Sequence, residues 1–524
     1  AFNTVPGMTL YDPATGLYGG IQNPEEENVS NFNPYRRQWF YKPEYPTKTK
    51  RSVVKLNARL TPVKGLTIQG SFAYNYWERN IEHHLTDRNL YRFTLDGPVL
   101  IREGTVRTYI RRYNYKNTYR SSEITAKYDF DISRLRTSVF AGMSQEYNKY
   151  DTDYYIKYDL VDPSLGAINA GMTNGSITGN YNEWAMRSYF GRINLNWDDR
   201  YLIEANLRAD GSSKFAPGKR WGYFPSVSAA WRISQEKFMA ASSSWLNQLK
   251  LRASYGSLGN NATTSYYMYQ SLFATANYIL NGNIAGGLAQ TVLANPELTW
   301  EKTYMTNIGL DFAMFNSRFS GTIDIYNKNT KGILISLPAP LEHGTSTVPN
   351  QNAGEVNNKG FEFDLRWNDR IGKVSYNVGV NMGFVNNKVT RFQGDVSSIN
   401  GVYKTQEGKP INQLYVITVD RIVRDQSDLD YVQSLVDRNP DYFATYQRPE
   451  LGDFLYRDAN GDGKLDTNDR VEIGHGNVPR ITYGANLGAS WNNFDFSVLF
   501  QGVADYKVYY NNQAFRFVTV RDNR

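Results

Sequence analysis

An acidic loop late in the chain has the residue types and the spacing of a calcium site. Residues 458–469 read DANGDGKLDTND, with an oxygen-bearing side chain at every second position of the first half. The twelve-residue calcium loop of an EF-hand has this spacing, with a glycine at the sharp turn. The pattern predicts that six residues supply metal ligands, with the lysine contributing its backbone carbonyl: Asp458, Asn460, Asp462, Lys464, Asp466 and Asp469.

The segments on either side of this loop do not have the helical pattern of an EF-hand. We therefore expect an isolated Ca²⁺ loop with a structural role, which holds a long outer loop in place. The alternative is a surface loop rich in Asx turns that hydrogen-bonds to itself and binds no metal.

Sequence signals for enzymatic chemistry are poor. The four histidines, His83, His84, His343 and His475, lie in no metal-binding or catalytic motif. Residues 234–237 match S-x-x-K, but the partner motifs of the serine enzymes that use it are missing. We therefore expect no catalytic residues and no catalytic cofactor.

Clusters of aromatic residues in the expected loops are candidates for ligand contact. Aromatic rings beside Asn, Asp and Arg suit stacking on sugars or gripping of extended peptides, although such rings also pack loops against one another. The sequence does not decide between these two roles, so the substrate-binding residues stay unassigned. The clusters are Tyr35, Trp39, Phe40, Tyr41 and Tyr45; Tyr150, Tyr154, Tyr155 and Tyr158; and Tyr266, Tyr267 and Tyr269.

The acidic loop leads into a strand pair with strict alternation of apolar residues. Between Ile481 and Trp491 every second residue is apolar or small, and the same holds from Phe494 to Phe500 after Asn492 and Asn493. A period of two is the mark of a strand with one apolar face. The pattern predicts a tight hairpin.

The same pattern recurs along the chain and predicts about fourteen strands of roughly 9–12 residues, enough to cross an outer membrane when tilted. Short turns join hairpin partners, whereas most of the connections between hairpins are long. One rim of short turns and one of long loops is typical of a transmembrane barrel. The hairpins are expected at 52–76, 124–141, 189–207, 227–255, 304–325, 361–382 and 481–500, and the long linkers at 78–118, 148–184, 258–301, 327–359 and 385–479.

Composition agrees with an all-β protein. Of the 524 residues, 41% are hydrophobic and 15% aromatic, and Tyr alone accounts for 40. No run of about 18 apolar residues encodes a transmembrane helix. Cysteine is absent, which excludes disulfides and thiolate chemistry. The net charge of +7 is small and its charges are interspersed, so we expect no nucleic-acid partner.

The chain is expected to form one partial barrel domain in four parts. Residues 1–50 would be a loop region, 51–384 the barrel hairpins, 385–479 a long outer loop with the acidic segment, and 480–524 a further hairpin with the segment that follows it.

Several sequence blocks resemble the SusC family of TonB-dependent outer-membrane transporters of Bacteroidetes. Together they span most of residues 185–502 in the order found in the family. The blocks are RADGSSKF at 208–215, RWGYFPS at 220–226, LKLRASYG at 249–256, NPELTWE at 295–301, NAGEVNNKGFE at 352–362, EGKPI at 407–411 and the stretch 452–502.

The resemblance implies a large plugged barrel of about 22 antiparallel strands. It also implies residence in the bacterial outer membrane, a SusD-type surface lipoprotein as partner, and energy delivered through the TonB complex. The sequence departs from the family pattern at both ends, since no plug domain, TonB-contact segment or closing strand is apparent. We therefore expect the central and later part of a larger transporter.

The expected function is TonB-dependent import of oligomeric nutrients, either oligosaccharides or oligopeptides. A passive porin or a surface adhesin on the same barrel is the first alternative. A soluble, glycan-active β-rich enzyme is a second, and it would need a catalytic pair of carboxylates.

Overall fold

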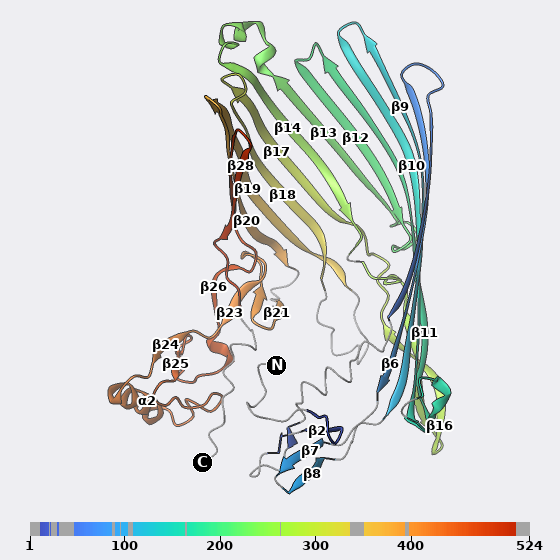
Figure 1. Ribbon diagram of the computed structural model, residues 1–524, viewed down its shortest axis with the longest axis vertical. Helices are drawn as coiled ribbons and strands as arrows, with labels where there is room; N and C mark the ends of the chain where they lie inside the picture. The colour runs from blue at the N-terminus through green and yellow to red at the C-terminus, as the bar shows by residue number, and fades with distance from the viewer. Residues whose placement is uncertain are drawn as a thin grey trace.

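A single antiparallel sheet of 14 strands dominates the structure, a computed structural model (Figure 1). The sheet order is β28-β27-β20-β19-β18-β17-β14-β13-β12-β11-β10-β9-β6-β5. The strand number and the antiparallel all-β class predicted from the sequence are confirmed. The structure describes residues 11–19, 21–22, 29–30, 47–85, 90–94, 96–102, 108–162, 165–262, 264–335, 350–392 and 398–509.

Each strand of the large sheet pairs with its sequence neighbour in that sheet, so the chain runs up and down along the wall. The strands are β5 Lys48–Leu60, β6 Leu66–Leu85, β9 Tyr109–Ile132, β10 Leu135–Leu160, β11 Gly171–Trp197, β12 Tyr201–Ser212, β13 Trp221–Arg232, β14 Leu246–Asn260, β17 Glu301–Met314, β18 Phe319–Ile335, β19 Gln351–Ile371, β20 Val374–Phe392, β27 Ile481–Trp491 and β28 Phe494–Ala504.

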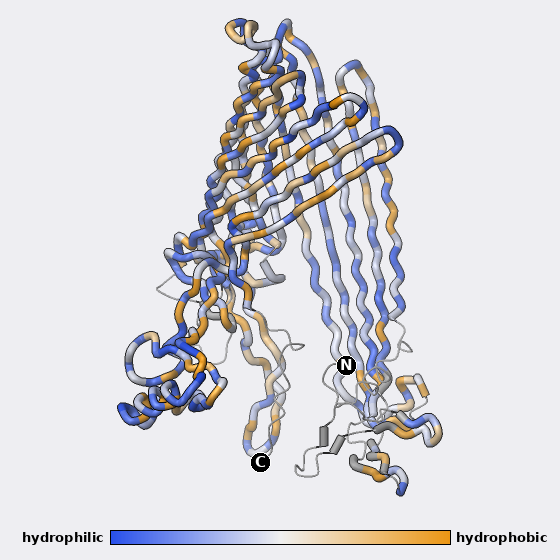
Figure 2. The backbone as a smooth tube through the Cα atoms, turned by 60° about the vertical axis from the view of Figure 1, so that its left-hand side comes forward, coloured by the Kyte–Doolittle hydropathy of each residue, from blue (hydrophilic) through white to orange (hydrophobic). Residues whose placement is uncertain are grey.

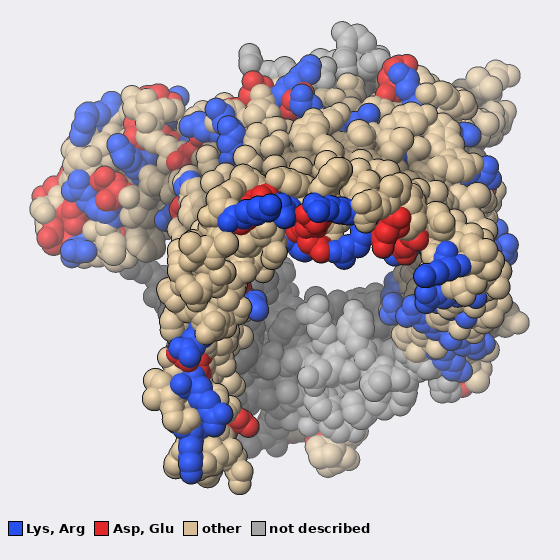
Figure 3. Space-filling view, turned by 90° about the horizontal axis from the view of Figure 1, so that it is seen from above, with Lys and Arg blue, Asp and Glu red and all other residues tan. Residues whose placement is uncertain are grey.

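The period of two gives the sheet two chemically different faces, and hydropathy alternates along its strands (Figure 2). One continuous row across β10 to β14 consists of Val139, Ile193, Ala205, Val227 and Tyr255. The row one residue away on the opposite face is polar and consists of Ser138, Asn194, Glu204, Ser228 and Ser254. The sheet is curved, and charged side chains line its concave side (Figure 3). We call the polar side the inner face and the apolar side the outer face.

The short turns have the chemistry that strand reversal needs. Asp198 and Asp199, between β11 and β12, both have positive φ (53° and 58°), as the type I′ turns favoured in hairpins require. Asp and Asn tolerate this region better than most residues do. The hairpin predicted at 189–207 is confirmed, and in its turn the Arg200 amide donates to the carbonyl of Trp197 at 2.9 Å.

Two of the predicted long linkers are largely strand, so those predictions are wrong. The segments 78–118 and 148–184 hold the parts of β6, β9, β10 and β11 nearest the long-loop rim, and these strands are 20, 24, 26 and 27 residues long. These segments are polar on both faces and lack the alternation that was used to find strands. Pairing with neighbouring strands keeps them extended without an apolar face.

Smaller elements occupy the long-loop rim. β15 (Leu272–Leu280) and β16 (Asn283–Val292) form a separate two-stranded hairpin, and β1 (Tyr11–Asp12), β2 (Leu17–Gly19), β7 (Leu90–Thr94) and β8 (Gly97–Arg102) form a small sheet. β3 (Ile21–Gln22) pairs with β4 (Val29–Ser30), and η1 covers Ile168–Ala170. On the opposite rim, the connection between β13 and β14 contains the 3-10 helices η2 (Ile233–Gln235) and η3 (Lys237–Ser242).

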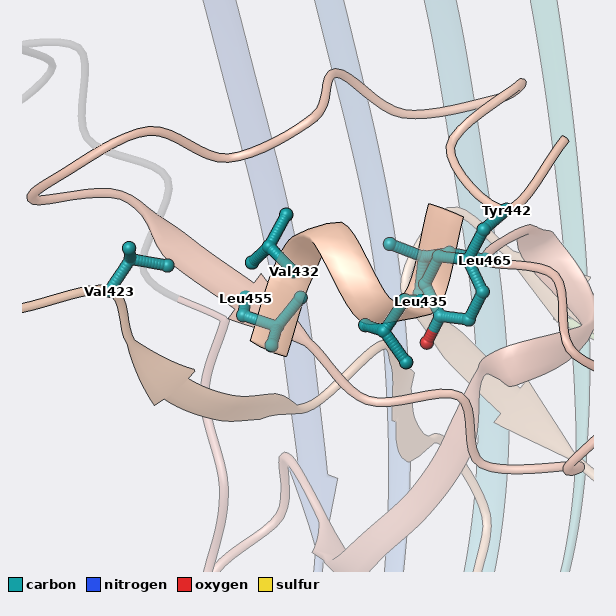
Figure 4. Close-up of a cluster of buried hydrophobic side chains, with 6 residues drawn as sticks. All are labelled: Val423, Val432, Leu435, Tyr442, Leu455 and Leu465. Atoms are coloured by element: carbon teal, nitrogen blue, oxygen red, sulfur yellow. The ribbon is translucent and has the colours of Figure 1, made fainter. Parts of the chain in front are cut away.

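A lobe between β20 and β27 has a hydrophobic core of its own, made by Val423, Val432, Leu435, Tyr442, Leu455 and Leu465 (Figure 4). Helix α2 (Gln426–Arg438) supplies two of these side chains and begins at Asp425, whose carboxylate accepts the Asp428 amide. The other elements are β21 (Ser398–Asn400), β22 (Tyr403–Thr405), β23 (Gln413–Val416), β24 (Val419–Ile422), β25 (Phe454–Tyr456), η5 (Thr467–Asp469) and β26 (Val471–Gly476). The sequence did not predict this helix.

In the part of the chain that the structure describes, no helix is both long enough and apolar enough to span a membrane. The predicted division into four parts stays a prediction, and most of its first part, residues 1–50, lies outside the described residues.

Candidate functional site

The inner face of the sheet carries a hollow lined by polar and charged side chains. Its volume is about 750 Å³, and it crosses strands β9 to β14 and β17. Asn194, Asn196, Glu204, Lys250 and Arg252 are among the residues that line it. A wall of this kind can hydrogen-bond to a polar solute or to a protein segment inside the barrel.

Arg252 is the centre of an ionic network beside this hollow. Its guanidinium donates to both carboxylate oxygens of Asp324, at 2.9 and 2.7 Å, and its Nε donates to Asp311 at 2.9 Å. Lys250 adds a second cation 3.4 Å from Asp311. Because Arg252 lies on β14, Asp311 on β17 and Asp324 on β18, the network joins three strands.

Toward the long-loop rim, the inner face becomes aromatic. Tyr113 lies 4.8 Å from Tyr154 between ring centroids, and it stacks on Tyr115 at 6.0 Å. Tyr115 in turn stacks on Tyr150 at 6.3 Å. We call these four residues the inner tyrosine cluster. The guanidinium of Arg111 lies 5.4 Å from the Tyr113 ring centroid, which places a cation at the edge of the cluster.

The sequence identified only half of the inner tyrosine cluster. Tyr150 and Tyr154 were candidates, whereas Tyr113 and Tyr115 were missed because they lie on the preceding strand. The register Tyr113↔Tyr154 brings the two halves together. An extended pairing of residues 109–132 with 135–160 would have shown this, but both segments were interpreted partly as loops.

The other aromatic candidates are placed differently. Tyr158 packs edge-on against Tyr109 at 6.3 Å, and Tyr266 lies 6.2 Å from Tyr267. The hydroxyl of Tyr267 accepts the Glu183 amide at 3.4 Å, so this ring packs a loop against β11. The cluster from Tyr35 to Tyr45 lies outside the described residues.

The acidic loop is held mainly by its own backbone. The two carboxylate oxygens of Asp458 accept the amides of Gly461 and Gly463, at 2.7 and 3.0 Å. Asn460 accepts the Asp462 amide, and Asp462 accepts the Lys464 amide, each at 2.9 Å. These are the Asx turns that the sequence offered as the alternative to metal binding.

Asp469 closes the loop from within. It is completely buried, and its carboxylate accepts the amides of Ala459 and Asp466 at 2.8 Å and that of Asn460 at 3.4 Å. Asp466 caps η5 by accepting the Asn468 amide. The oxygen donors suit Ca²⁺ in type and spacing. Among the described residues, however, no three Asp, Glu or His side chains converge on one point.

The loop is anchored to the core of the lobe by Tyr442. The Leu465 amide donates to the Tyr442 carbonyl at 2.9 Å, and the Tyr442 side chain is 5% exposed. Burial, and after it the nearby carboxylate of Asp458, raise the pKa of Tyr442 to about 12. The ring therefore stays neutral over the physiological range.

The histidines that the structure describes make ordinary polar contacts. His83 Nδ1 lies 2.8 Å from the Arg111 guanidinium, and His475 Nε2 lies 2.6 Å from that of Arg480. His343 lies outside the described residues, as does the side chain of His84.

A family model described as "TonB dependent receptor-like, beta-barrel" matches residues 2–523, which is nearly the whole chain. The chain belongs to the TonB-dependent receptor β-barrel family. This confirms the family suggested by the sequence blocks at 185–502, and it accounts for the curved up-and-down sheet. The family is one of receptors and transporters, which speaks against the enzyme alternative.

Curated relatives in this family come from Bacteroidetes. TonB-dependent receptor P26 of Formosa agariphila is 32% identical over 348 residues, covering 65% of this chain and 34% of the relative. TonB-dependent receptor SusC of Bacteroides thetaiotaomicron is 29% identical over 333 residues, covering 62% of this chain and 32% of the relative. The matched segments therefore span only about a third of the length of these relatives.

Among solved structures, the RagAB peptide transporter has the same fold. The TM-score is 0.75 at 22% identity, and the match covers 95% of this chain and 52% of that one. The closed-closed state of the RagAB peptide importer gives a TM-score of 0.74 at the same identity. The barrel wall of this TonB-dependent receptor thus corresponds to about half of a solved chain.

Proposed function

We propose that this chain forms the barrel of a TonB-dependent outer-membrane importer of oligosaccharides or oligopeptides. A SusD-type surface lipoprotein would close over its long-loop rim. The observation that carries the proposal is the inner tyrosine cluster, which presents four rings and the Arg111 cation on the inner face between the long loops and the polar hollow. Aromatic faces with a cation beside them suit extended oligomeric ligands.

Transport through such a barrel involves no covalent chemistry. The substrate would be held between the long loops and the lipoprotein, in contact with the inner tyrosine cluster, and would then pass along the polar inner face. TonB would supply the energy that opens the path. SusC and the RagAB peptide transporter, one a relative and the other of the same fold, support the importer class. Glycan and peptide cargo both remain in the proposal.

Uptake by cells that carry the full-length protein tests this function. We expect Tyr113→Ala with Tyr154→Ala to lower uptake of a labelled oligopeptide or oligosaccharide roughly tenfold, because each lost ring contact costs about 0.5–1.5 kcal/mol. The matched Tyr→Phe pair keeps the rings and should retain most of the uptake. Unchanged uptake in a strain lacking the gene would contradict the proposal. Uptake that persists without TonB would favour the passive porin.

We also propose that the acidic loop binds Ca²⁺ as a structural brace. Asp458, Asn460, Asp462, Asp466 and Asp469 would offer side-chain oxygens and Lys464 its carbonyl, which suits a hard cation. Calorimetric titration of chelator-treated protein should show Ca²⁺ uptake that disappears in Asp458→Asn with Asp462→Asn. Asp495→Asn, on β28 and outside the acidic loop, is the control. No heat of binding in the unaltered protein would leave the loop as a self-bonded surface turn.

A further inference from the structure

The outer face of β17 to β20 changes from apolar to basic within a few residues. The row Ile308, Ile325, Phe361 and Phe384 is continuous across the four strands, and the two phenyl rings stack at 5.7 Å. One step nearer the long-loop rim, the same face carries Thr306, Asn327, Lys359 and Asn386. The next row carries Tyr304, Asn329, Asn357 and Lys388.

The row after that adds Lys302 and Lys331, which are direct register partners. We call Lys302, Lys331, Lys359 and Lys388 the outer basic cluster. In the part of the chain that the structure describes, no hydrogen bond or ion pair joins any of these four ammonium groups to another residue. Within the described residues, the charge of these four ammonium groups is compensated by no direct ion pair, although Glu355 is the register partner of Lys331.

The nearby carboxylates are already engaged. Glu355 lies 3.7 Å from the guanidinium of Arg391, which adds another cation to this surface. Glu407 accepts the Phe392 amide at 3.0 Å. Five cations, the four lysines and Arg391, thus face two carboxylates on this surface, which leaves a net positive charge among the described residues.

Amide donors supplement the lysines. Asn357 Nδ2 donates to the side-chain oxygens of both Asn327 and Asn329, at 2.6 and 2.5 Å. Because both of these asparagines use their oxygens, their NH₂ groups remain as donors. The three asparagines, Lys359 and Lys388 line a concavity of about 460 Å³, together with the carboxylate-bearing Glu407. It combines positive charge with N–H donors, as binding of a phosphate requires.

The same transition occurs on the outer face of β6, β9 and β10. A concavity of about 680 Å³ is lined at one side by Phe72, Ile124 and Met143, and at the other by Arg120 and Lys149. Arg120 lies over the Tyr74 ring at 5.9 Å. Apolar side chains beside basic ones complement a lipid, because the acyl chains can contact the apolar side and the headgroup the basic side.

We propose that the outer basic cluster binds the phosphorylated headgroup of an outer-leaflet lipid. The inference rests on the proposed function, because it requires the outer face to meet the membrane. Lysine stems can lie along the apolar rows while their ammonium groups reach the headgroups. Each basic residue at an anionic membrane surface strengthens binding by about fivefold. A soluble cargo would contact the inner face of the sheet. Binding of a charged cargo therefore does not explain why the lysines of the outer basic cluster lie on the outer face.

The test compares two doubly substituted full-length proteins in nanodiscs of phosphatidylcholine, to which diphosphoryl lipid A is added. Lys359→Gln with Lys388→Gln alters the cluster. Lys328→Gln with Lys373→Gln removes the same charge from the inner face of β18 and from the short turn between β19 and β20. We expect the first pair to weaken lipid A binding at least about tenfold, and the second to leave it within about twofold.

Equal affinities of the two variants for lipid A would overturn the inference. It would also be overturned if the unaltered protein bound phosphatidylcholine as tightly as lipid A. Competition by inorganic phosphate at the affinity of lipid A would also overturn it, because the site would then select a free anion. Membrane fractionation and uptake by the unaltered protein test the proposed function separately. If the unaltered protein fails those tests, the importer proposal is contradicted. If its uptake is intact but Lys359→Gln with Lys388→Gln leaves lipid A binding unchanged, only this inference is contradicted.

Discussion

At the residue scale, Tyr442 links the acidic loop to the core of the lobe. Its ring packs edge-on against Phe443 at 4.8 Å and lies in the cluster of Val432, Leu435 and Leu465 (Figure 4). Its hydroxyl titrates late because it is buried and because Asp458 is near. The ionisation of this one group therefore reports on the integrity of the loop and the lobe together.

The raised pKa of Tyr442 predicts alkaline loss of stability in the lobe. The pKa is about 12 in the folded protein, against about 10 in an unfolded chain. The neutral form is favoured by folding, so this stability is fully present below about pH 10 and is lost as pH rises toward 12. Two pKa units correspond to about 2–3 kcal/mol.

Local unfolding followed by hydrogen exchange in residues 426–469 against pH would measure this loss. Tyr442→Phe should remove the alkaline step, whereas Tyr431→Phe, on the same lobe, should keep it. An alkaline step of the same size in Tyr442→Phe would show that another group is responsible.

At the element scale, Arg252 ties together β14, β17 and β18 on the inner face. The side chains of Asp311 and Asp324 are only 18% and 20% exposed, so both use the guanidinium to compensate their charge, and Asp311 also has Lys250 nearby. Arg252→Met should cost about 3–5 kcal/mol, because two partly buried carboxylates lose their main partner. Arg252→Lys should have a stability between those of the unaltered protein and Arg252→Met, because an ammonium group keeps the charge but cannot form the bidentate contact.

Thermal unfolding in detergent would rank these variants. Arg366→Met is the control, because its ion pair with Asp364 at 2.8 Å involves an arginine side chain that is 66% exposed. Exposed pairs contribute at most about 1 kcal/mol. If the Arg252 and Arg366 variants unfolded at the same temperature, the network would have no special role in holding the strands together.

The sequence predicted those elements whose residues alternate in hydropathy, and missed those held by other means. The hairpin of β27 and β28 and the Asp198–Asp199 turn follow directly from local pattern. The part of β10 nearest the long-loop rim has polar and aromatic residues on both faces, such as Asp151, Asp153 and Tyr154, and is extended because β9 and β11 pair with it. Helix α2 buries Val432 and Leu435 against residues distant in sequence, which no local window contains.

At the scale of the whole molecule, the same alternation produces two surfaces with opposite requirements. The outer row through Val139, Ile193 and Val227 remains 39–49% exposed, although a water-soluble sheet would cover such residues. The inner face carries the hollow, the Arg252 network and the inner tyrosine cluster. An apolar outside and a polar inside are what a barrel in lipid needs.

This division predicts opposite outcomes for two adjacent substitutions. Ile193→Lys places a charge on the outer face at a cost of about 2–4 kcal/mol at the centre of a bilayer. Asn194→Lys places it on the inner face, beside its register partner Glu204, where water and a carboxylate accept it. Outer-membrane fractionation, with heat-modifiable mobility as the measure of folding, should show poor assembly for the first variant and normal assembly for the second. Equal assembly of both would mean that the outer face does not meet lipid. The importer and the lipid site would then fall together, while the fold and the ion-pair network would stand.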